Sequence, residues 1–158
     1  MLAPADHTAV ESMLGRPLMV DAAVVVRRRS GEPVVIRNHP LAADGTPMPT
    51  RYWLVDPEWR TAVSRLESSG GVRGAEAAVP EDVVAATHAS YAVERDGALP
   101  ADHEGPRPSG GVGGTRQGVK CLHAHVAYLL AGGDDAVGRW TMAQLEGVAL
   151  PPVVAELA

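Results

Sequence analysis

Apolar residues recur along the chain at two spacings, one typical of strands and the other of helices. Two β-branched runs, 22–28 and 33–38, flank the polar turn segment 29–32, which predicts a β-hairpin. A third strand is expected at 50–55, after a connection over 39–49 that contains three prolines. These segments predict a small antiparallel sheet of about three strands.

Helical spacing dominates the rest of the sequence. Asp56 and Pro57 form a cap followed by a proline in the first helical position, and apolar residues then recur at i, i+3, i+4 and i+7 until Gly70-Gly71. Further helices are expected over 7–14 (capped by Asp6), 80–96, 115–131 and 137–147. We therefore expect one α+β domain over residues 1–158, with about five helices packed on the sheet.

Composition narrows the class of protein. The chain has 158 residues, 14 basic against 19 acidic side chains, and a formal charge of −5, which disfavours nonspecific binding to nucleic acid or to an anionic membrane. The single cysteine excludes an internal disulfide, and the longest apolar runs are far shorter than the roughly 20 residues of a membrane helix. No secretion signal is recognisable, so we expect a cytoplasmic protein without membrane insertion. The oligomeric state is not predicted.

The segment 109–125 has the highest density of chemically useful residues. It contains a glycine loop, the only lysine, the only cysteine and two of the six histidines. Free N–H groups at a helix start bind anions, so the loop 110–115, with Gly113 and Gly114, is a candidate cradle for a phosphate or carboxylate. Lys120, Arg116 and His123 would supply charge-assisted hydrogen bonds. In the alternative, the glycines form a plain turn and Lys120 pairs with a carboxylate beside a buried helix.

Two nucleotide-binding motifs are excluded. Val119 separates Gly118 from Lys120 where a P-loop needs adjacent residues, and Cys121 replaces the usual hydroxyl residue. Arg116 breaks the dinucleotide pattern that would begin at Gly111. We expect no cofactor.

Cys121 has three interpretations. It is a nucleophile if the helix start and Lys120 lower its pKa and His125 acts as base. Cys121 and His125 are also spaced to share a metal, but such a site must borrow ligands from His88, His103 or an acid elsewhere. His123 and His125 are about 200° apart on a helix and cannot share one ion. The third interpretation, a buried structural thiol with no metal, is favoured because Cys121 falls about two turns into the predicted helix.

A second group of polar residues shares one face of the helix expected over 80–96. His88, Tyr91 and Arg95 are spaced at i, i+3 and i+7. This face completes a polar pocket if it turns toward Lys120 and His123. The alternative is a hydrogen-bonded histidine with Tyr91 packed beneath it and Arg95 in solvent.

With these elements in place, the chain resembles the DUF501 family, bacterial proteins of unknown function. The likeness rests on segments 14–17, 44–54, 64–67, 88–96 and 119–123. Members are often encoded near enolase and a small septum-formation protein, so the resemblance implies a role near growth or division but names no substrate. Many members carry cysteines where this chain has the segment 27–30, so a metal role for those cysteines does not transfer. His125 stands where members commonly have an aliphatic residue, which favours His123 for shared chemistry.

The sequence thus predicts a site for a small phosphorylated or carboxylated ligand. Lys120 and Arg95 would bind the anion, with His123 or His88 as general acid or base. The remaining expected ligand contacts are Tyr91, Gly113, Gly114, Arg116 and Cys121. Whether a reaction is catalysed is left open. The rival hypothesis is a noncatalytic interaction or adapter protein, in which the same residues hold the fold and a protein partner binds the loops or a sheet edge.

Overall fold

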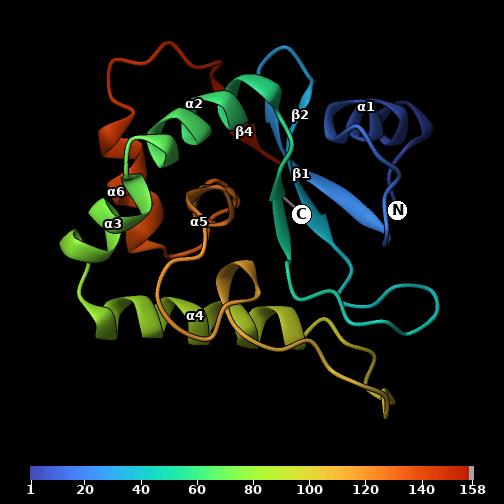
Figure 1. Cartoon of the computed structure of the whole chain (residues 1–158). Coiled ribbons are helices and arrows are strands. Elements are labelled where there is room, and N and C mark those ends of the chain that lie inside the picture. The colour runs from blue at the N-terminus through green and yellow to red at the C-terminus, as the bar shows by residue number, and fades with distance from the viewer. Residues whose placement is uncertain (157–158) are drawn as a thin grey trace.

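The computed structural model describes residues 1–156, which form a four-stranded antiparallel sheet covered mainly by helices (Figure 1). The helices are α1 (Pro4–Leu14), α2 (Pro57–Ser68), α3 (Gly71–Ala78), α4 (Glu81–Asp96), the 3₁₀-helix η1 (Val112–Gly114), α5 (Leu122–Leu130) and α6 (Ala136–Gln144). The strands are β1 (Ala22–Arg28), β2 (Pro33–Asn38), β3 (Tyr52–Leu54) and β4 (Val153–Ala155). The expected α+β class is confirmed.

The sheet has the strand order β3-β2-β1-β4. The β1–β2 hairpin has the bounds that the alternation of apolar residues predicts, and β3 lies within the expected segment. The expected count of about three strands is one too low, because β4 pairs with the outer edge of β1 through Val26 and Ala155. This strand has only three residues and two of them are exposed, so no burial pattern marks it in the sequence.

A bulge in β1 divides its side chains between two cores. The pairing of β1 with β2 shifts register on both sides of Val26. Val24 consequently packs with Val10 of α1 on one face, whereas Val26 joins the larger cluster formed with the other helices. The sheet is therefore covered by α1 on one side and by the main helical layer on the other (Figure 1).

Helix α5 is central in that layer and contacts α2, α6, β3 and η1. It begins at Leu122, so the helix expected from residue 115 is wrong in its first two turns. Gly118 has φ +64°, a left-handed conformation that helical residues do not adopt, and Cys121 is an extended N-cap. The carboxylate of Glu67 accepts the Leu122 N–H at 2.6 Å and so satisfies a donor that the helix itself leaves free.

The other helices differ from expectation mainly at their ends. Asp56 caps α2 as predicted, accepting hydrogen bonds from the N–H groups of Glu58 and Trp59. Helix α1 begins at Pro4, and Asp6 is not its cap, because the Asp6 carboxylate binds Arg27 instead. Helix α3 was not expected, since it starts directly after the glycine that ends α2. No helix within residues 1–156 is long and apolar enough to cross a membrane.

Candidate functional site

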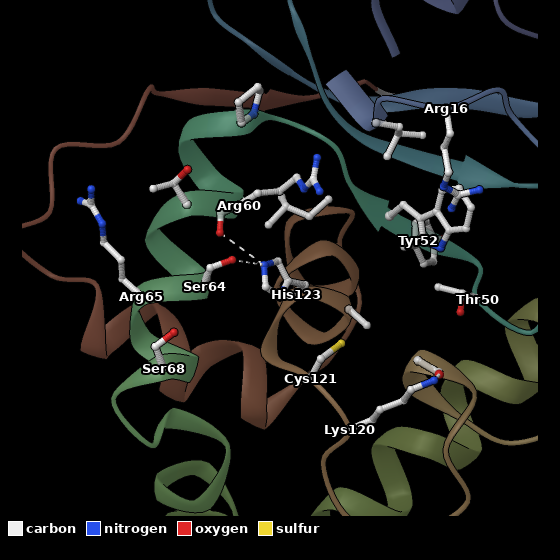
Figure 2. Close-up of a pocket in the computed structure, with 17 residues that line it drawn as sticks. Arg16, Thr50, Tyr52, Arg60, Ser64, Arg65, Ser68, Lys120, Cys121 and His123 are labelled. Carbon is white, nitrogen blue, oxygen red and sulfur yellow. Dashed lines mark hydrogen bonds between the residues drawn. The ribbon is translucent and has the colours of Figure 1, made fainter. Parts of the chain in front are cut away.

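A pocket of about 860 Å³ lies between one face of α2, strand β3 and the start of α5 (Figure 2). Helix α2 is amphipathic: Trp59, Ala62 and Val63 are buried in the core. The opposite side, which includes Arg60, Ser64 and Arg65, lines the pocket. Arg16 closes the pocket on the side of the α1–β1 connection, and Gly113 and Lys120 close it on the side of η1.

Four cationic side chains, Arg16, Arg60, Arg65 and Lys120, line this pocket, and its lining includes no carboxylate. Within the described part of the chain, none of the four forms an ion pair. The Arg16 guanidinium stacks 4.8 Å from the centre of the Trp53 ring. Arg60 and Lys120 donate hydrogen bonds to the backbone carbonyls of Met13 and Gly113, at 2.9 and 3.2 Å. These contacts position the cations without neutralising them.

His123 is held in the pocket wall by groups on both of its ring nitrogens. Nδ1 lies 3.0 Å from the carboxylate of Glu67, and Nε2 lies 3.2 Å from the Ser64 hydroxyl and 3.3 Å from the Arg60 carbonyl. All three partners belong to α2. The imidazole is therefore oriented by side-chain and backbone groups of α2, while its own backbone belongs to the first turn of α5.

Cys121 lines the pocket as the N-cap of α5. Burial raises the pKa of its thiol, and the nearby N–H groups of Ala124 and His123 oppose that shift without reversing it. The sequence placed Cys121 two turns inside a helix, and that position is wrong. The raised pKa argues against a thiolate nucleophile at neutral pH in the free protein.

Four of the expected site residues meet here: Gly113, Lys120, Cys121 and His123 all line the pocket. Lys120 is exposed, so the expectation of an ammonium beside a buried helix is wrong. The reason is the late start of α5, which leaves Lys120 in the connection before the helix.

The face of α4 that carries His88, Tyr91 and Arg95 is buried and does not line this pocket. His88 contacts backbone with both ring nitrogens: Nδ1 accepts the Val112 N–H at 3.0 Å, and Nε2 lies 2.7 Å from the Gly118 carbonyl. The hydroxyl of Tyr91 accepts the Arg51 N–H. Arg95 is 1% exposed, so the alternative that placed it in solvent is wrong.

The glycine loop supports these buried groups rather than forming a row of free N–H donors. A side chain at Gly111 would lie 2.4 Å from His88, so only glycine allows this close approach. Gly114 has φ +77° and lies against Pro49, outside the pocket lining. Arg116 is exposed and is not among the lining residues.

The His125 side chain contacts Asp135, and the group of metal-ligating side chains around Cys121 consists of Glu67 and His123 instead. Nδ1 of His125 is 2.7 Å from the carboxylate of Asp135, and both side chains are buried. Asp135 also caps α6 by accepting the Gly138 N–H. The contact between His125 and Asp135 therefore links α5 to the first turn of α6.

The site also contains five residues that were not predicted from the sequence as site residues: Arg16, Arg60, Ser64, Arg65 and Glu67. Arg60, Ser64 and Arg65 recur at i, i+4 and i+5 on the side of α2 opposite its apolar stripe, which is a helical signal visible in the sequence. What the sequence lacks is the position of this face relative to Lys120 and His123, since the two segments are over 50 residues apart.

The comparisons with known proteins give a family. The sequence model of DUF501, described as a protein of unknown function, matches residues 24–143, well over half of the chain. The chain belongs to the DUF501 family. Searches of curated proteins and of solved structures found no match. Two of the segments that carry the DUF501 resemblance, 64–67 and 119–123, meet at the edge of the pocket. Ser64, Cys121 and His123 line the pocket, and Glu67 contacts His123 beside it.

Proposed function

We propose that this protein binds a small anionic ligand, phosphorylated or carboxylated, in the pocket between α2 and the start of α5. The observation that carries the proposal is the set of four cations, Arg16, Arg60, Arg65 and Lys120, around a pocket whose lining has no carboxylate. The chain as a whole carries a charge of −5. Cations without ion-pair partners, gathered around one pocket of an acidic protein, give that pocket a local positive potential that attracts an anion.

The arrangement favours a ligand that carries both an anionic group and an apolar or hydroxylated body. Arginine forks bind phosphate and carboxylate in two-point contacts, and Lys120 adds a point charge from the opposite wall. Tyr52, Trp53 and Leu54 of β3 add apolar surface to the pocket lining. His123 is the one histidine that lines the pocket within the described residues, so it is the candidate general acid or base if the ligand is transformed.

Calorimetry and thermal unfolding of the purified protein test the proposal. The panel is inorganic phosphate, sugar phosphates, nucleotides and dicarboxylic acids. A ligand at 100 times its dissociation constant should add about 2.7 kcal/mol to the free energy of unfolding. Replacing Lys120 or Arg65 by alanine should weaken binding by about 1.5–3 kcal/mol, the value of a charged hydrogen bond.

Arg73→Ala is the matched control, because Arg73 is an exposed arginine on α3 that does not line the pocket. It should bind the ligand as the wild type does. If no anion in the panel shifts the unfolding midpoint, or if Arg73→Ala weakens binding as much as Arg65→Ala, the proposal is wrong. The first result would favour the adapter hypothesis and direct the search to protein partners.

A further inference from the structure

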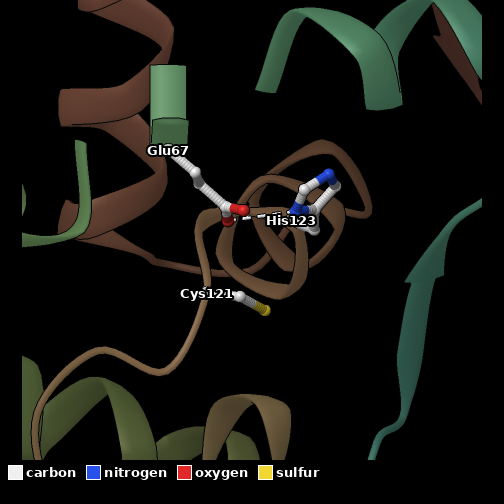
Figure 3. Close-up of side chains that lie close together, drawn as sticks. All are labelled: Glu67, Cys121 and His123. Atoms are coloured by element: carbon white, nitrogen blue, oxygen red, sulfur yellow. Dashed lines mark hydrogen bonds and ion pairs between the residues drawn. The ribbon is translucent and has the colours of Figure 1, made fainter. Parts of the chain in front are cut away.

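Three different metal-ligating side chains converge at the edge of the pocket. A carboxylate oxygen of Glu67, Sγ of Cys121 and a ring nitrogen of His123 all lie within 4.8 Å of one another (Figure 3). Helix α2 supplies Glu67, and the start of α5 supplies the other two. All three side chains are partly buried, so an ion between them would be partly shielded from solvent.

The hydrogen bonds around His123 leave one ring nitrogen facing this cluster. Nε2 lies 3.3 Å from the carbonyl oxygen of Arg60, which only accepts hydrogen bonds, so a proton on Nε2 has a partner. In this tautomer the Nδ1 lone pair faces the Glu67 carboxylate, 3.0 Å away, and a metal ion can lie between the two. In the other tautomer Nδ1–H donates to Glu67 and the Ser64 hydroxyl donates to Nε2, so metal binding would displace the proton from Nδ1.

We propose that Glu67, Cys121 and His123 bind a zinc ion, with a fourth coordination position open to the pocket. Three protein ligands from nitrogen, sulfur and oxygen, plus one open position, are the pattern of catalytic zinc sites. Bond lengths of about 2.0–2.3 Å place tetrahedral ligands roughly 3.3–3.8 Å apart, so the three atoms need small side-chain rotations to close around the ion. A thiolate and a carboxylate together balance the two charges of zinc.

The surroundings already orient two of the three ligands. The Leu122 N–H donates to Glu67 at 2.6 Å and fixes its carboxylate at the start of α5. The Arg60 carbonyl and Ser64 hydroxyl hold Nε2 of His123. Metal-binding histidines commonly donate their other N–H to a carbonyl or carboxylate in this way, and such contacts set the ligand's orientation.

Zinc binding by these three side chains does not require the anionic ligand. Only the contact between that ligand and the fourth coordination position of zinc rests on the proposed function. A zinc centre neutralised by Glu67 and Cys121 leaves the charges of Arg65 and Lys120 available to the rest of the anion. With zinc bound, His123 acts as a metal ligand and not as the general acid or base. The two proposals therefore fail separately, and the experiment below measures each one alone.

Cobalt(II) titration of the full chain, after removal of metal with a chelator, tests the site. Cys121 is the only cysteine, so any sulfur-to-cobalt charge-transfer absorption must come from it. We expect one equivalent of cobalt to produce this absorption and one equivalent of zinc to abolish it. Absence of the absorption in the wild type would overturn the proposal.

Ligand variants separate a built site from a lone reactive thiol. Cys121→Ser should lose the absorption, and Glu67→Gln and His123→Gln should each bind zinc at least about tenfold more weakly. Glu67→Gln keeps an acceptor for the Leu122 N–H, and circular dichroism checks that each variant is folded. His7→Gln, at an exposed histidine of α1, is the matched control and should bind as the wild type. If Glu67→Gln and His123→Gln bind zinc normally, or if His7→Gln is equally weakened, the proposal is wrong.

The phosphate and carboxylate panel is then repeated with zinc and with chelator. If an anion binds in the presence of chelator and zinc does not change its affinity, only the contact between the anion and the fourth position of zinc is refuted. Cobalt binding without any anion binding would refute the proposed function and leave the metal site standing.

Discussion

Arg95 of α4 donates a hydrogen bond to the carbonyl oxygen of Gly110, with Nη1 and O 2.8 Å apart. The same guanidinium lies 3.3 Å from the carbonyl oxygens of Pro49, Pro108 and Ser109, and its Nε donates to the Asp96 carboxylate. One buried cation thus joins the glycine loop and the connection before β3 to α4. Its donors are occupied by backbone carbonyls and by the Asp96 carboxylate.

Arg95→Met should therefore destabilise the fold strongly. Methionine fills similar volume but leaves several carbonyls and the Asp96 carboxylate without their donor. We expect the free energy of unfolding to fall by about 3–5 kcal/mol, the usual cost of removing one partner from a buried charged network. Urea unfolding followed by circular dichroism measures it. A loss below 1 kcal/mol would show that water replaces the guanidinium at no cost.

Lys120→Ala should have the opposite profile. The Lys120 side chain is exposed and its single hydrogen bond goes to the Gly113 carbonyl, which solvent can reach in its place. The free energy of unfolding should change by no more than about 0.5 kcal/mol. The same urea titration checks this. A large loss in the free energy of unfolding would favour the alternative interpretation, in which Lys120 has a structural role.

Local signals were enough to predict the hairpin, α2 and the apolar character of α5, because each depends on residues close together in the chain. Long-range contacts decided the rest. The start of α5 is set by Glu67, 55 residues earlier, which accepts the Leu122 N–H, and no local pattern contains that partner. Because the predicted helix began too early, Cys121 was expected inside the helix and Lys120 was expected beside a buried helix.

Only the part of the candidate site that is local in sequence could be predicted. Lys120, Cys121 and His123 are neighbours in sequence, so their density alone singled them out. Arg60 and Arg65 reach Lys120 through the packing of α2 against α5, and Arg16 reaches the pocket from the connection between α1 and β1. His88 and Arg95 are residue types that often bind ligands, and they were expected to bind one together with the glycine loop. In the structure they form hydrogen bonds with the backbone of that loop instead.

His125→Ala should destabilise the joint between α5 and α6. Asp135 is fully buried. In the variant it would keep its hydrogen bond from the Gly138 N–H but lose its contact with the imidazole. A buried carboxylate that loses a hydrogen-bond partner costs about 1–3 kcal/mol, and the cavity left by the ring adds to this. Thermal unfolding of His125→Ala beside His103→Ala, a histidine in the 97–111 loop, measures the difference. Equal midpoints for the two variants would contradict the prediction.

Asp6 should contribute to stability at neutral pH and lose that contribution in acid. Both carboxylate oxygens accept hydrogen bonds from Arg27, at 2.8 and 2.7 Å, and these bonds hold the pKa of Asp6 below its usual value, against the opposing effect of burial. A carboxyl group whose pKa is lower in the folded state stabilises the fold at pH above its unfolded pKa of about 3.9, and this stabilisation disappears as pH falls through the folded pKa. At pH 7, Asp6→Asn should cost up to about 1 kcal/mol, since the pair is partly exposed. Urea unfolding of both proteins from pH 7 to pH 2 should show the difference shrinking below about pH 4; a difference that stays constant over this range would contradict the assigned ion pair.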